Sequence, residues 1–182
     1  AEECRSLRPG ISVEFNCAHG ALPSMEKGIS DGLCRAGDYA GGDLYRTFRT
    51  QSFACKLFRG LSRMQPFEYM TGRCVPDLHN HTMTKTRDQL TLAVMLTLAH
   101  HGANLLIDAM DPEGTLDSRV YERIGEVYGK AMAYEPFLTG ELRAEVGVCF
   151  SQECKEWPSP IGTNHYTGAL GAAETLQRAH IG

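Results

Sequence analysis

Strand-like and helix-like patterns alternate along most of this chain, and this alternation limits its fold more than any other feature. Short apolar or alternating segments predict strands at 11–16, 38–43, 67–71 and 103–108. Amphipathic spacing predicts helices at about 47–63, at 90–98 before Gly102, and from Asp117 to Met132. Alternating strands and helices imply a parallel sheet that is covered by helices.

A change of pattern near residues 138–141 divides the chain into two expected domains, 1–140 and 141–182. Residues 144–150 are predicted as a new strand, and apolar residues at helical spacing predict a last helix over 166–176. A single strand and helix cannot bury both of their own faces. We therefore expect 141–182 to be the beginning of a second α/β domain.

Charge and composition exclude several classes of protein. Eighteen basic and 22 acidic residues give a formal net charge of -4, so no basic excess favours nucleic acid as a partner. The apolar stretch at 90–98 is far shorter than the roughly 20 residues of a membrane span, and the first residues lack a signal-peptide pattern. The seven cysteines are odd in number and form no CxxC pair, so we expect free thiols in the cytoplasm.

The most specific motif lies between residues 102 and 128. The sequence GANLLIDAMDPEGTLD from Gly102 to Asp117, followed by VYERIGEVY, resembles the last strand, loop and helix of α-L-fucosidase-type glycoside hydrolase barrels. PFEYM, from Pro66 to Met70, is similar to the PWE(T/S)C strand of the same family. Residues 66–102 also resemble the penultimate strand and helix of β-galactosidases that carry a flavodoxin-like trimerisation domain.

This resemblance covers roughly residues 66–180, whereas 11–65 fits only by the order of its elements. It implies the C-terminal half of a (β/α)8 barrel, followed by the start of a flavodoxin-like trimerisation domain. It further implies a hydrolase of O-glycosidic bonds, of the α-L-fucoside or β-galactoside class. The fucosidase nucleophile, an Asp on a middle strand, would belong to the other half of the barrel. We therefore expect a homo-oligomer or a companion chain to complete it.

Active sites of (β/α)8 barrels lie at the C-terminal ends of the strands, and glycoside hydrolysis usually needs two carboxyl groups there. Glu68 matches the glutamate of the PWE(T/S)C strand and is the first candidate for a catalytic acid/base, followed by Asp43. The expected sugar-binding residues are Glu14, Asn16, His19, Tyr45, Thr71, Arg73, His79, Asn80, His81 and Asp108.

The two family resemblances disagree about one strand. The β-galactosidase alignment places that family's nucleophilic glutamate at Thr71, whose side chain cannot serve as a carboxylate. Because Glu68 and Thr71 are an odd number of positions apart, the two alignments also turn opposite faces of the strand inward. Both alternatives stay open at this point.

Metal ions and cofactors are not expected. His79 and His81 are two residues apart on a predicted loop, which is not the HxxxH or HExxH spacing of a helical metal site. Glycine-rich nucleotide-binding patterns are also absent from the sequence. We expect His79, Asn80 and His81 to contact sugar instead.

Two further interpretations compete with the glycosidase hypothesis. The chain could be a non-catalytic, degenerate barrel fragment that binds carbohydrate or serves assembly, as Thr71 would allow. It could also be a stand-alone flavodoxin-like domain, which predicts a phosphate-binding loop at 16–20. A complete pair of catalytic carboxylates would favour the enzyme.

Overall fold

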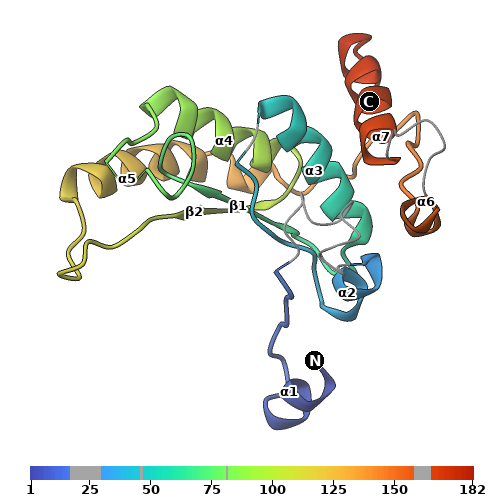
Figure 1. The fold of residues 1–182 in the computed structure, drawn as a ribbon, viewed down its shortest axis with the longest axis horizontal. Helices are drawn as coiled ribbons and strands as arrows, with labels where there is room; N and C mark the ends of the chain where they lie inside the picture. Colours follow the sequence, from blue (N-terminus) through green and yellow to red (C-terminus); the bar gives the residue numbers. More distant parts are fainter. Residues whose placement is uncertain (17–29, 46, 81, 158–164) are drawn as a thin grey trace.

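A computed structural model describes residues 1–16, 30–45, 47–80, 82–157 and 165–182 of this chain. The fold is mixed α/β, with a parallel pair of strands at its centre (Figure 1). The elements of the described residues are α1 (Glu2–Leu7), α2 (Asp31–Ala36), α3 (Phe48–Leu61), β1 (Glu68–Gly72), α4 (Arg87–Ala99), β2 (Ala103–Ile107), α5 (Ser118–Met132), the short 3-10 helix η2 (Glu135–Phe137), α6 (Gln152–Glu156) and α7 (His165–Arg178).

The strands predicted at 67–71 and 103–108 form β1 and β2, which pair in parallel from Glu68 opposite Ala103 to Gly72 opposite Ile107. The segments predicted as strands at 11–16 and 38–43 lie parallel to their neighbours but form only single bridges. Asn16 is bridged to Gly41, and Asp43 is bridged to Met70. The described residues thus place four parallel segments side by side in chain order.

The predicted amphipathic helices α3, α4 and α5 all form, and they cover one face of β1 and β2 (Figure 1). Tyr69 is buried on this face in a core that also contains Phe58 of α3. A second core joins Val94 of α4 to Val127 of α5. Alternation along β1 therefore turns Glu68 and Met70 to the opposite face. We call that opposite face the open face; on β2 it carries the exposed residues Ala103 and Leu105.

Local sequence explains where α4 begins and why β2 follows it so closely. Thr86 and Gln89 form a capping box at the first turn of α4. Gly102 allows the Phe67 ring to approach the turn before β2, since a Cβ atom at this position would lie 2.3 Å from that ring. The capping box thus fixes the start of α4, and Gly102 allows the close packing of Phe67 just before β2 begins.

The strand predicted at 144–150 is not formed, and this prediction is wrong. Within the described residues, this segment adopts no strand and forms no β-bridge. Its one backbone link in the described residues to the end of the chain joins the Glu145 N–H to the Gly182 carbonyl, at 3.0 Å. The helix predicted at 166–176 does form, as α7, and packs through Ala169 and Ala173 against Phe53 of α3.

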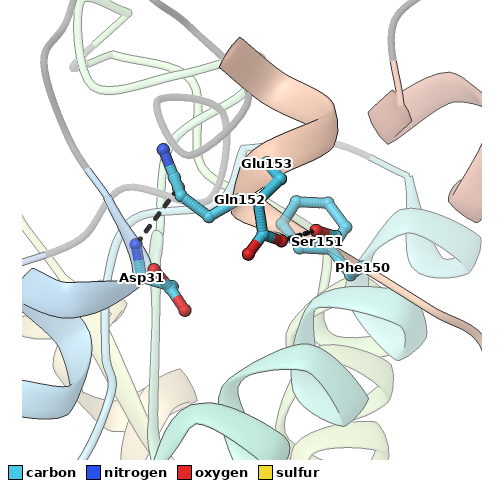
Figure 2. A pocket seen from close by; sticks show the side chains of 5 residues that line it. All are labelled: Asp31, Phe150, Ser151, Gln152 and Glu153. Carbon is cyan, nitrogen blue, oxygen red and sulfur yellow. Dashed lines mark hydrogen bonds between the residues drawn. The ribbon is translucent and has the colours of Figure 1, made fainter. Parts of the chain in front are cut away.

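The connection before α7 also contacts the first half of the chain. The Asp31 backbone N–H donates a hydrogen bond to the Gln152 side chain at 3.4 Å, across a surface pocket that includes Phe150 and Glu153 (Figure 2). Within the described residues, no helix is long and apolar enough to cross a membrane.

Candidate functional site

Three carboxylates from three neighbouring segments meet on the open face. Gly41 lies between them, because a Cβ atom at this position would be 3.0 Å from Glu14 Oε1 and 3.0 Å from Glu68 Cβ. Asp43 follows two residues later and therefore points to the same face as Gly41. We call Glu14, Asp43 and Glu68 the carboxylate cluster.

Burial and mutual repulsion act on two members of this cluster. Burial raises the pKa of Glu14, and the charges of Glu68 and then Asp43 raise it further. Glu14 Oε1 is buried and has no hydrogen-bond partner among the described residues. Burial also raises the pKa of Glu68, with a smaller contribution from Asp43. Both glutamates therefore favour the protonated form more than an exposed glutamate does.

Asp43 has a different environment, because two side chains hold it in place. Asn16 Nδ2 donates to Asp43 Oδ2 at 3.2 Å, and the Tyr45 hydroxyl donates to Asp43 Oδ1 at 3.1 Å. Burial and the Asp43 charge raise the pKa of Tyr45 to about 12, so the phenol keeps its proton for this hydrogen bond. Asp43 is thus presented as an oriented acceptor.

The cluster extends along the strands. Glu68 is the first residue of β1, whereas Asp43 is bridged to Met70, nearer to the C-terminal end at Gly72. Gly72 is four positions after Glu68, which corresponds to about 13 Å at the usual rise per residue of a strand. Asp43, together with Tyr45 that is bound to it, is therefore nearer than Glu68 to the C-terminal edge of the strands. Active sites of barrels lie at that edge.

Thr71, Arg73 and Asp108 lie on the side of the helices, away from the cluster. Thr71 is 3% exposed, and its Oγ1 accepts a hydrogen bond from Lys85 Nζ at 3.0 Å. Arg73 donates to Asp108, and both side chains of this ion pair are only 8% exposed. In this structure Glu68 faces the open side and Thr71 faces the helices.

The histidine loop lies on the surface. The backbone N–H of His79 donates to Asp77, whose carboxylate also accepts from the Asn80 amide, and the His79 side chain is 93% exposed. His19 and His81 lie outside the described residues. The structure therefore brings together Glu14, Asn16, Asp43, Tyr45 and Glu68, but it does not join His79 or Asn80 to them.

Two residues near the cluster were missed by the sequence analysis. The carboxylates of Glu68 and Glu14 contribute to a raised pKa of Tyr39, after burial, so this phenol lies near the cluster. Gly41 was not named there either, although it leaves the space in which Glu14 and Glu68 approach each other. Gly41 and Asp43 are two positions apart and therefore lie on the same face of an extended segment. This spacing could have identified the open face from the sequence.

No set of three or more His, Cys, Asp or Glu side chains in the part of the chain that the structure describes is arranged to hold a metal ion. The chain shows no significant match to a protein-family model, a curated protein or a solved structure.

Proposed function

We propose that this chain forms part of a glycoside hydrolase and that the carboxylate cluster is its catalytic centre. One observation carries the proposal: Glu14, Asp43 and Glu68 meet on one face of parallel segments, in two different electrostatic environments. Glycoside hydrolysis needs one carboxylic acid that keeps its proton and one carboxylate that acts as a nucleophile or base.

In the proposed mechanism, Glu14 donates its proton to the oxygen of the departing sugar group. Glu68 supports this role, because its negative charge opposes ionisation of Glu14. Asp43, oriented by Asn16 and Tyr45, attacks the anomeric carbon or removes a proton from the attacking water. Glu14 then takes up a proton when water completes the reaction. The sequence analysis gave Glu68 the acid role; we now propose Glu14, because two neighbouring carboxylates raise its pKa whereas one raises that of Glu68.

The fold supports a barrel origin for this site. Four parallel segments in chain order, with α3, α4 and α5 on one face, are the arrangement of consecutive units in a (β/α)8 barrel. The open face would then be the barrel interior, and a second copy or a companion chain would close it. The described cysteines are free thiols, which fits a cytoplasmic location.

Hydrolysis of aryl α-L-fucosides and aryl β-galactosides tests this proposal, with the chain assayed alone and with any co-purifying companion. Glu14→Gln and Asp43→Asn should each lower the turnover rate at least about a hundredfold, the usual contribution of a catalytic acid or base. Glu122→Gln, on the exposed side of α5, is the matched control and should keep full activity. Equal activity of all four proteins would exclude the cluster from catalysis.

One observation favours carbohydrate binding without catalysis as a second candidate. Glu68 lies at the N-terminal end of β1, whereas catalytic groups of barrels lie at the opposite edge. Saturable binding of fucose or galactose, without turnover of either aryl glycoside, would favour this candidate over the enzyme.

A further inference from the structure

A second polar site lies on the other side of β1, beneath the helices. Here a partly open cavity of about 160 Å³ is lined by residues of β1, α3, α4 and the segment that follows β1. Its polar lining includes Thr71, Tyr45, Gln51, Lys85 and Gln89. The carboxylate cluster does not line it, and the proposed glycosidase mechanism makes no use of Lys85.

Lys85 brings a positive charge to this cavity. Its ammonium group donates to Thr71 Oγ1 at 3.0 Å and to the Gly72 carbonyl at 2.6 Å, and both acceptors are neutral. In the described parts of the chain, no carboxylate lies within ion-pair distance of Lys85 Nζ. An ammonium group has three N–H donors, so one remains for a further acceptor.

The surroundings make this charge costly. Burial lowers the pKa of Lys85, with Cys74 as the only opposing influence. A bound anion would offset the loss of solvation, as an opposite charge does for any half-buried ion. Asp43 and Asp77 lie near the Tyr45 side of the cavity, so an anion is held better on the opposite side, beside Lys85.

Gln89 provides a second donor at the mouth of the cavity. Its side-chain oxygen accepts a hydrogen bond from the Thr86 backbone N–H at 2.9 Å, as part of the capping box of α4. The oxygen is thereby fixed, so the amide nitrogen carries the remaining hydrogen-bonding capacity of this side chain. Gln89 is exposed and Lys85 is half-buried, so the two residues offer N–H donors at the mouth and at the wall of the same cavity.

We propose that this cavity binds a small oxyanion, a phosphate, sulfate or carboxylate group, through Lys85 and Gln89. The oxyanion is either free in solution or one end of a larger ligand, such as a phosphorylated sugar. The proposal is independent of the glycosidase function, because neither the cavity nor its donors belong to the carboxylate cluster.

Calorimetric titration of the whole chain with inorganic phosphate tests the site. The wild-type chain should bind one phosphate saturably below roughly 10 mM. Lys85→Met keeps the length of the side chain without the charge and should weaken binding at least about tenfold, the loss expected for one charge-assisted hydrogen bond. Lys130→Met, at an exposed position of α5, is the matched control and should bind like the wild type.

Gln89→Glu keeps the test decisive if Lys85→Met does not fold. Glutamate preserves the capping box but places a carboxylate at the cavity mouth, so phosphate binding should be lost while the fold is retained. Comparing glucose 6-phosphate with free phosphate separates the two sources of the oxyanion: tighter binding of the sugar phosphate indicates a larger ligand, and equal binding indicates a free anion. The proposal is overturned if the wild type shows no saturable binding, or if both variants bind phosphate as tightly as the wild type.

Discussion

The Tyr45 hydroxyl donates a hydrogen bond to Asp43 Oδ1 at 3.1 Å, and Tyr45 also lines the cavity that contains Lys85. The same side chain therefore borders both polar sites of the molecule, one on each side of β1. Because burial and Asp43 keep the phenol protonated, its hydrogen bond fixes the carboxylate on the open face.

Removing the Tyr45 hydroxyl should weaken the proposed catalytic centre without unfolding the chain. Tyr45→Phe leaves the ring in place but deletes one of two donors to Asp43. We expect the turnover of an aryl glycoside to fall about tenfold, because a hydrogen bond to a charged group contributes about 1.5–3 kcal/mol. The rate is measured beside the thermal unfolding midpoint. Unchanged turnover would mean that this phenol does not position Asp43 for the reaction.

A side chain at Gly41 should disrupt the cluster directly. The methyl group of Gly41→Ala would lie 3.0 Å from both Glu14 Oε1 and Glu68 Cβ, so we expect a loss of about 1–3 kcal/mol in unfolding free energy. The control is Gly125→Ala in α5, where no atom lies within 4 Å of the new methyl group. That control should stabilise the chain by up to about 1 kcal/mol, because alanine favours a helix. Urea unfolding measures both changes, and equal effects at the two glycines would contradict the crowding at Gly41.

Replacing Glu14 should raise stability in a pH-dependent way. The folded pKa of Glu14 is raised above the ordinary 4.5, so its favourable contribution is complete below 4.5 and is lost as the pH rises through the raised pKa. Glu14→Gln imitates the protonated acid at every pH. Its unfolding free energy should therefore exceed that of the wild type at pH 7.5, and the difference should shrink as the pH falls towards 4.5. A lower stability of the variant at pH 7.5 would show that ionised Glu14 is not strained.

His100 should make the fold sensitive to acid. Burial, followed by the charges of Lys56, Arg59 and His101, lowers the pKa of His100 from 6.5 to about 4. The unfolded chain binds this proton first as the pH falls, so stability is lost between about 6.5 and 4, by at most about 3 kcal/mol. The neutral ring also bonds to Ser52 Oγ at 2.9 Å.

Urea unfolding at pH 6.5 and 4.5 checks this sensitivity. His100→Gln should lose less stability than the wild type between the two values, because glutamine does not take up a proton. His79→Gln changes an exposed histidine and serves as the control. A wild-type loss no larger than that of His100→Gln would contradict the prediction.

The sequence predicted the helices more successfully than the pairing of strands. The periodic apolar residues of α3, α4, α5 and α7 predicted these helices correctly. The spacing of apolar residues along one helix face is a local property of the chain, so it can be read from the sequence. Residues 144–150 show the opposite case: their alternation predicts a strand, but they pair with no strand among the described residues. A strand also needs a neighbour, which a local pattern cannot provide.

The candidate site was predictable where one strand face carries it. Glu14, Asp43 and Glu68 were all named from their positions on or after strands, and all three reach the open face. The sequence left open which face of β1 the helices would cover. The burial of Tyr69 against α3 shows that it is the face opposite Glu68. Arg73 and Asp108 are 35 residues apart, and nothing local in the sequence foretold that they would pair with each other on the side of the helices.

The central claim is that Glu14 shares one electrostatic site with Glu68 and Asp43. Carbon-13 NMR titration of the glutamate side-chain carboxyls measures this directly in the wild type, Glu68→Gln and Asp43→Asn. We predict that Glu14 titrates above the ordinary range of a glutamate, and that each substitution lowers its pKa by removing a neighbouring charge. An ordinary titration of Glu14 that neither substitution changes would contradict the claim.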